Sequence, residues 1–177
     1  MARRSSNRIR NRQTVDLMRL EPDSRVLEIG CGPGLALAQC SETVSSGRIV
    51  GLDHSPVMLE QARKRVGSGQ VELIVGGVDQ LDQWSGEFDR IYSLNVIQFI
   101  ADKQDFFRRV SSTLDAGGRC FTTYQPRLDN DHPDGADRMA EEIVRLMGEV
   151  GFTQIDRSRI DAGPTPAWCV YGTKPAG

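Results

Sequence analysis

Gly30, Gly32 and Gly34 follow directly on the apolar run 25–29, which has the length of a buried strand. Because glycine has no Cβ atom, such a turn can adopt left-handed backbone dihedrals and can let a ligand approach the backbone closely. Asp53 closes the next apolar run, 19 residues after Gly34. In nucleotide-binding α/β folds, a carboxylate at this place hydrogen-bonds a ribose diol. The pattern therefore predicts a site for a ribose-bearing ligand where parallel strands end.

The spacing of the glycines argues against a dinucleotide ligand. The dinucleotide fingerprint is G-x-G-x-x-G, and its third glycine would fall on position 35, which is Leu35 here. Glu28 precedes Gly30 by two residues and is expected to place a carboxylate at the mouth of the site, where it would repel a pyrophosphate. A ligand with an ammonium and a sulfonium group is favoured instead. An NAD-dependent oxidoreductase is therefore disfavoured.

The segment from Val26 to Gly34, VLEIGCGPG, resembles motif I of the class I S-adenosylmethionine-dependent methyltransferases, in particular their small methyltransferase-domain members of types 11 and 25. The resemblance continues in GLDHSPVM at 51–58, FDRIYSLNVIQ at 88–98 and LDAGGRCF at 114–121, so that it covers about residues 15–175. It implies a Rossmann-like α/β fold with a doubly wound seven-stranded sheet of order 3-2-1-4-5-7-6, strand 7 antiparallel, in a three-layer αβα arrangement. It also implies S-adenosylmethionine as the cofactor and S-adenosylhomocysteine as the product.

The resemblance assigns a set of cofactor contacts. Glu28 and the backbone of 30–34 would hold the methionyl end, and Asp53 would bind both ribose hydroxyls. Leu94 and Asn95 would meet the amino acid end of the cofactor near the substrate. The complete predicted set is Glu28, Gly30, Cys31, Gly32, Gly34, Asp53, His54, Met58, Val78, Asp79, Leu94 and Asn95.

The adenine contacts follow from the same resemblance. His54 and Met58 would flank the ring, while Val78 and Asp79 would lie along its edge. Many relatives carry Gly-Asp-Ala after the third strand, whereas this chain has Gly-Gly-Val at 76–78 with the next acid at position 79. Backbone groups can still contact an adenine edge at this place. Each predicted contact, taken singly, also has a structural interpretation as a capping, loop or core residue.

The chemistry that the resemblance implies is an in-line displacement. The sulfonium already activates the methyl donor, so alignment supplies much of the catalysis, and a general base is needed only for a hydroxyl or a protonated amine. Gln98 stands where relatives often carry a histidine, and an amide can only orient a substrate. The catalytic residue stays unknown, and the candidates are Asn95, Gln98, Tyr124 and His132.

Alternating strands and helices must position these residues. Strands are predicted at 25–29, 48–52, 71–75, 88–94, 119–124, 153–160 and 167–173, and helices at 8–20, 35–44, 56–66, 105–114 and 136–150. Ser55 is predicted to cap the helix that begins with Pro56, and the glycines at 117 and 118 are predicted to end the helix before them. This order favours a mostly parallel sheet covered by helices on both sides, in a single domain over 1–177.

The first 20 residues hold six arginines and one acid. An apolar stripe from Ile9 through Val15 and Met18 predicts a helix. For the arginines, a solvated or frayed terminus is favoured over a nucleic-acid arm. Because no other segment is long enough, this arginine-rich helix over 1–20 is the candidate lid. In that hypothesis Arg8, Arg10 or Arg12 closes the site over a small anionic substrate.

The net charge of −2, with 38% hydrophobic and 26% charged residues, fits an ordinary soluble protein and disfavours nucleic acid as a partner. The leading prediction is a methyltransferase that acts on a small molecule of unknown identity. Two alternatives stay open. One is an RNA or protein methyltransferase docked by the basic N-terminus, and the other is a catalytically silent S-adenosylmethionine-binding domain.

The remaining composition predicts little further chemistry. Four cysteines without a C-x-x-C pair and two histidines give no spacing for a metal site, so no metal is expected. No apolar stretch approaches the length of a membrane span or has the form of a signal peptide, so a cytoplasmic protein without membrane contact is expected. A homodimer through the final strands is a further hypothesis.

Overall fold

The computed structural model describes residues 2–67, 69–126 and 135–177. The described residues form a seven-stranded sheet of order β3-β2-β1-β4-β5-β7-β6, in which only β7 runs antiparallel to its neighbours. The strands are β1 (Arg25–Ile29), β2 (Arg48–Asp53), β3 (Val71–Val75), β4 (Phe88–Leu94), β5 (Leu114–Tyr124), β6 (Thr153–Ile160) and β7 (Ala167–Thr173). The predicted Rossmann-like fold, with its sheet order and antiparallel strand 7, is confirmed.

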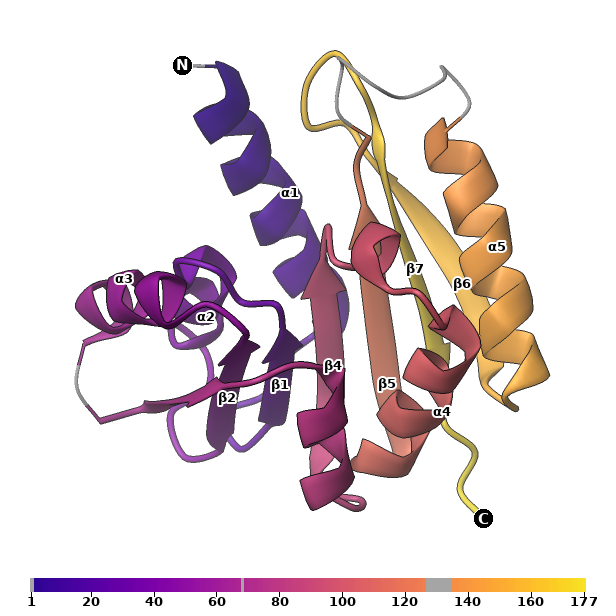
Figure 1. Cartoon of the computed structure of the whole chain (residues 1–177), viewed down its shortest axis with the longest axis horizontal. Coiled ribbons are helices and arrows are strands. Elements are labelled where there is room, and N and C mark those ends of the chain that lie inside the picture. The colour runs from indigo at the N-terminus through magenta and orange to yellow at the C-terminus, as the bar shows by residue number, and fades with distance from the viewer. Residues whose placement is uncertain (1, 68, 127–134) are drawn as a thin grey trace.

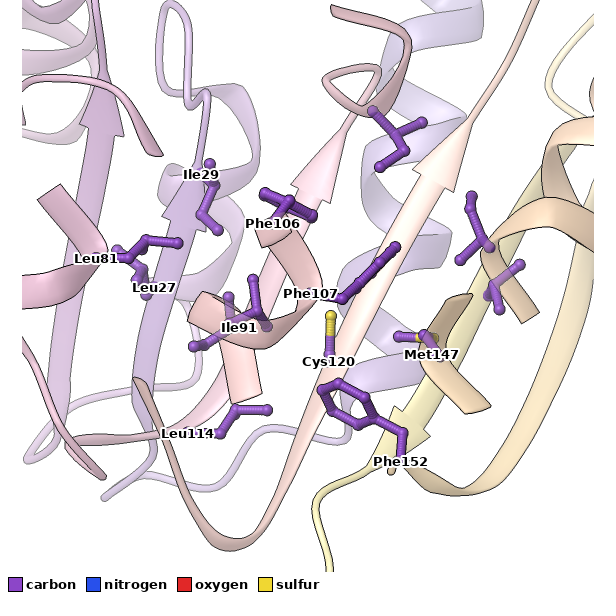
Figure 2. Close-up of a cluster of buried hydrophobic side chains, with 14 of the residues drawn as sticks. Leu27, Ile29, Leu81, Ile91, Phe106, Phe107, Leu114, Cys120, Met147 and Phe152 are labelled. Atoms are coloured by element: carbon purple, nitrogen blue, oxygen red, sulfur yellow. The ribbon is translucent and has the colours of Figure 1, made fainter. Parts of the chain in front are cut away.

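Helices cover both faces of this sheet and complete the three layers (Figure 1). The helices are α1 (Ala2–Met18), α2 (Leu35–Cys40), α3 (Pro56–Val66), α4 (Lys103–Thr113) and α5 (Gly135–Glu149), with short 3-10 helices η1 (Val78–Gln83) and η2 (Ile97–Phe99). One buried cluster joins the sheet to α4, α5 and η1, and Figure 2 shows Phe107 and Met147 of this cluster close to Cys120. A second cluster joins the other face to α1, α2 and α3.

Three element boundaries differ from the sequence prediction by four residues or more, and the first is the start of α1, which lies at Ala2 rather than at 8. Helix α2 ends at Cys40 rather than at 44, because a turn at 41–43 and a bend at 45–47 lead into β2. Strand β5 begins at Leu114 rather than at 119, so the glycines expected to end α4 lie inside the strand. Its pairing with β4 shifts register between Phe88 and Arg90, and Gly117 donates its N–H to the carbonyl of Lys174 at 3.0 Å. The glycines therefore shape an irregular strand entry instead of a helix end.

Helix α1 is built differently from the predicted apolar stripe. Ile9 is 41% exposed, so its predicted place on the buried face is wrong. The buried side of the helix is half polar, and its members are Arg10, Asn11, Thr14, Val15 and Met18. The hydroxyls of Thr14 and Thr123, on β5, share a hydrogen bond of 2.9 Å. From Ser6 onward α1 is thus a packed layer of the fold and not a frayed terminus, while Arg8 and Arg12 are exposed to solvent.

Candidate cofactor site

The glycine turn lies at the carboxyl end of β1, beside the ends of β2 and β4. Gly30, Gly32 and Gly34 have φ angles of 71°, 52° and 75°, the left-handed region that the sequence pattern predicts. The N–H groups of Gly30 and Cys31 both donate to the carbonyl of Leu52, at 2.7 and 3.0 Å. These two hydrogen bonds fix the turn to the neighbouring strand β2.

The three glycines have different surroundings. A Cβ atom on Gly30 would lie 2.4 Å from Cγ2 of Val96, and one on Gly34 would lie 2.9 Å from Cβ and 3.1 Å from Cα of Ala62. A Cβ atom on Gly32 would meet no atom within 4 Å. Gly30 and Gly34 therefore allow neighbouring elements to pack closely. Gly32 faces open space, so its backbone is the part of the turn that a ligand can approach.

The Asp53 carboxylate is held in place by backbone groups on two elements. Its Oδ2 accepts from the N–H of Gly32 at 2.8 Å, and its Oδ1 accepts from the N–H of Ser55 at 2.9 Å. Ser55 also caps α3, because its Oγ accepts from the N–H of Met58 at 3.4 Å, as the sequence predicts. Only 7% of Asp53 is exposed. The carboxylate is thus oriented beside Gly32 without any ligand.

Glu28 lies behind the glycine turn, on the face of the sheet that α1 and α2 cover. It is 2% exposed and accepts a hydrogen bond of 2.8 Å from the Tyr92 hydroxyl. Its prediction at an open mouth of the site is wrong, because strand alternation turns it into the layer beneath the turn. Burial raises the pKa of Glu28 to about 8, although the Tyr92 hydrogen bond acts in the opposite direction. Glu28 is therefore mainly protonated at neutral pH.

We expect this buried carboxyl group to make the folded protein less stable as the pH rises. Between its ordinary pKa of 4.5 and the folded value of about 8, Glu28 holds more protons in the native state than in the unfolded state. The free energy of unfolding should fall across this window, by up to about 4 kcal/mol. In Glu28→Gln that fall should disappear, as urea titrations from pH 5 to 9 will measure. The exposed Glu21→Gln is the control, and a wild-type pH slope in Glu28→Gln contradicts the prediction.

The other predicted cofactor contacts lie along the same edge of the sheet. His54 has an 89% exposed side chain, with Nδ1 3.7 Å from Oδ1 of Asp53. Val78 and Asp79 open η1, just past the end of β3. The remaining members, Met58 and Leu94, are half-buried and buried. Apart from the buried Glu28, the structure thus brings the predicted adenine, ribose and methionyl contacts to one edge.

Cys31 takes part in this edge through its backbone. Its side chain is 5% exposed and belongs to the buried cluster under α1 and α2. The Sγ atom lies 3.8 Å from the carbonyl oxygen of Gly32, and burial raises the pKa of the thiol. Any ligand contact at this position would therefore come from its peptide group.

Two catalytic candidates meet at the carboxyl end of β4. Asn95 has a φ of 55°, and its Oδ1 accepts from the N–H of Gln125 at 2.8 Å. Gln98 donates from Nε2 to the carbonyl of Asn95 at 2.9 Å, while its Oε1 is buried without a hydrogen-bond partner in the described part of the chain. Tyr124 is 7% exposed and packs in the cluster under α4 and α5. His132 lies outside the described residues.

Sequence reasoning missed two residues that support this edge. Tyr92 was treated only as part of a motif, yet it stands directly opposite Glu28 in the β1–β4 pairing, which the strand alternation could have indicated. Gln125 was treated as the start of a loop, although it directly follows a strand that ends at the site. Its amide bridges α1 and the segment before β7.

Two grooves of the molecule lie away from the glycine turn. One, of about 410 Å³, lies between α5 and β6, and the other, of about 350 Å³, lies between α1 and β6. Neither is lined by a predicted site residue. Over the described ranges, no three His, Cys, Asp or Glu side chains gather where they could hold a metal ion, and no helix is both long and apolar enough to cross a membrane.

The sheet order, the glycine turn and the acid at the end of β2 together define a class I S-adenosylmethionine-dependent methyltransferase. The profile of a family described as a methyltransferase domain matches residues 26–118. This match spans more than half of the 177 residues, and the chain belongs to that methyltransferase family.

Three similar proteins illustrate the range of the family. The chain is 25% identical over 172 residues to the uncharacterized methyltransferase YdaC of Bacillus subtilis, which covers 97% of this chain and 95% of YdaC. It is 30% identical over 133 residues to a trans-aconitate 2-methyltransferase of Methylobacterium radiotolerans, or 74% of this chain and 45% of that relative. A structure of a complex that contains the Haloferax volcanii Trm112 methyltransferase activator superposes with a TM-score of 0.81 at 17% identity, covering 98% of this chain and 93% of the other. The chain thus spans nearly all of one curated relative and less than half of the other.

Proposed function

We propose that this chain binds S-adenosylmethionine at the carboxyl ends of β1 to β4 and transfers its methyl group to a small-molecule acceptor. The observation that carries the proposal is the open space over Gly32, beside a carboxylate that Gly32 itself orients. Such an arrangement can place a ligand against the backbone of the glycine turn and two ribose hydroxyls against Asp53. The family membership supports the same cofactor.

The cofactor, when bound, supplies a methyl group that the sulfonium has already activated for in-line displacement. Asp53 would accept hydrogen bonds from the ribose hydroxyls, and the space over the Gly32 backbone would leave room for the ligand. Asn95 and Gln98 are amides, so they orient an acceptor and take no proton. The acceptor atom contributes the lone pair that forms the new bond to carbon, and the electrons of the broken carbon–sulfur bond stay on sulfur. A proton carried by the acceptor leaves to solvent.

Two observations favour a small acceptor over a macromolecule docked by the basic N-terminus. Arg12 is committed to Glu42, with hydrogen bonds of 2.8 and 3.0 Å, and Arg10 is buried. Two of the six N-terminal arginines are thus held by the fold or by a surface ion pair, which leaves fewer cations for a docking arm. The relative named a trans-aconitate 2-methyltransferase acts on a small polycarboxylate, which supports the same choice.

We also propose that the protein works in the cytoplasm. Cys31, Cys40, Cys120 and Cys169 are all free and buried. Unbridged cysteines are typical of a reducing compartment.

Calorimetry with S-adenosylmethionine, S-adenosylhomocysteine and NAD tests the cofactor. Both adenosyl ligands are expected to bind with one site per chain, and NAD is expected to show no heat of binding. Binding of NAD alone contradicts the proposal. Incubation with methyl-labelled cofactor and separate metabolite, RNA and protein fractions then tests the acceptor. Label found only in RNA or protein would show that the small-molecule acceptor is wrong.

A further inference from the structure

Arg10 is a buried cation whose partners are neutral. It belongs to α1 and is 7% exposed. Its Nη1 donates to Oε1 of Gln125 at 3.2 Å, and its Nη2 donates to Oδ1 of Asn11 at 3.4 Å. Its Nε is buried and has no hydrogen-bond partner among the described residues. The guanidinium therefore has at least one buried N–H group that is still able to donate a hydrogen bond.

The nearby carboxyl group does not neutralise this charge. Burial lowers the pKa of Arg10 to about 10, so the side chain is still charged at neutral pH. Glu28 is near enough for the two charges to affect each other, but no carboxylate forms a hydrogen bond or an ion pair with Arg10 in the described part of the chain, and burial raises the pKa of Glu28, which disfavours its charged form. Burying an ion without a counter-ion is strongly unfavourable. The buried charge of Arg10 has an explanation if a bound ligand supplies the missing anion.

Gln125 sets the position of this cation. Its Nε2 donates to the carbonyl of Thr165 at 2.8 Å, and its backbone N–H donates to Oδ1 of Asn95 at 2.8 Å. With the amide nitrogen committed to a carbonyl, Oε1 is left to accept from α1. Because Gln125 follows β5 and Asn95 follows β4, the guanidinium is held at the edge of the sheet that also carries the glycine turn.

We propose that Arg10 binds a carboxylate of a ligand in this site and that Gln125 is its positioning residue. A planar guanidinium matches the two oxygens of a carboxylate, which a single neutral donor cannot do. The inference rests on the proposed function, and the carboxylate can come from the methionyl end of the cofactor or from the acceptor. Of the three arginines in the lid hypothesis, the structure selects Arg10, because Arg8 is exposed and Arg12 pairs with Glu42.

Two ligands and two variants test the cofactor as the source. Calorimetry compares S-adenosylhomocysteine with methylthioadenosine, which lacks the amino acid end. If the cofactor provides the carboxylate, Arg10→Gln should bind S-adenosylhomocysteine about 10- to 100-fold more weakly, with unchanged affinity for methylthioadenosine. Arg8→Gln, an exposed change on the same helix, should bind both ligands as wild type does.

A third ligand tests the acceptor as the source. The carboxylate probe is trans-aconitate, added to protein that is saturated with S-adenosylhomocysteine. Arg10→Gln should bind trans-aconitate at least 10-fold more weakly than Arg8→Gln does. Unchanged binding of both S-adenosylhomocysteine and the probe in Arg10→Gln overturns the inference. The inference is also overturned if wild type and Arg10→Gln bind S-adenosylhomocysteine equally well and wild type does not bind trans-aconitate. A wild-type protein that binds no adenosyl ligand overturns the proposed function instead.

Melting curves separate ligand binding from a purely structural role. Arg10→Met removes the buried charge, so the ligand-free variant should melt at or above the wild-type temperature. Its melting temperature should rise less than that of wild type when S-adenosylhomocysteine or the probe is added. A lower melting temperature without ligand, combined with a wild-type response to ligand, would show that Arg10 only supports the fold. Arg10→Lys, which keeps the charge, is the variant to use if Arg10→Gln fails to fold.

Discussion

Replacing Gly32 by alanine is expected to leave the protein folded and to weaken S-adenosylhomocysteine binding about 100-fold, because an extra methyl group forced into a filled space costs about 1 to 3 kcal/mol. The added Cβ atom meets no protein atom within 4 Å, so only the positive φ of 52° opposes it, at about 1 to 2 kcal/mol. The same methyl group projects into the space that the ligand should occupy. Calorimetry and a thermal melt of the same sample measure both effects.

Gly34→Ala is the matched control, because it changes the same turn toward the protein instead of the ligand. Its Cβ atom would lie 3.1 Å from the Cα atom of Ala62 in α3, at a φ of 75°. A helix backbone cannot yield as a flexible side chain can, so a loss of about 2 to 4 kcal/mol in the free energy of unfolding is expected. If Gly32→Ala instead loses stability as Gly34→Ala does and binds ligand normally, the assignment of the open space to the cofactor is wrong.

The second large effect is expected in Asp53→Asn, which should bind S-adenosylhomocysteine about 100- to 1,000-fold more weakly. The carboxylate now accepts from two backbone N–H groups, of Gly32 and Ser55. An amide keeps one accepting oxygen and turns its NH₂ toward the other N–H, so it misplaces the turn and loses an acceptor for the ribose.

A ligand without one hydroxyl separates these two causes. Wild type should bind the 2′-deoxy analogue of S-adenosylhomocysteine more weakly than the parent ligand, and Asp53→Asn should discriminate much less between the two. Asp23→Asn, an exposed aspartate before β1, should behave as wild type. Equal discrimination in wild type and Asp53→Asn would show that Asp53 does not bind the ribose.

Local signals were sufficient for the elements that frame the site. The apolar run of β1, the glycines after it and Asp53 lie where the pattern predicts, because a buried parallel strand and a left-handed turn both depend on nearby residues. The cap of α3 was predictable for the same reason, since Ser55 and Pro56 act within one turn of the helix. The short helices η1 and η2 were missed, because three to six residues show no periodicity.

Contacts between distant segments could not be predicted from local spacing. The buried side of α1 is polar where it meets β5, so an apolar stripe placed Ile9 on the wrong face. The burial of Glu28 depends on α2 and on Tyr92, 64 residues further along the chain. The functions of His54, Met58, Val78 and Asp79 stay predictions, because their places along the edge of the sheet do not by themselves define a ligand contact.

The bond between Arg10 and Gln125 has a consequence for how the protein matures. It joins residues 115 positions apart, and the Gln125 amide is in turn held by Thr165, a further 40 positions along. A ribosome produces α1 well before the segment around Thr165. Contacts of such long range cost more loop-closure entropy than local ones. The hydrogen bonds that fix the glycine turn to Leu52 need the chain only as far as β2, whereas the Arg10 guanidinium is fully held in place only once Thr165 has been synthesised.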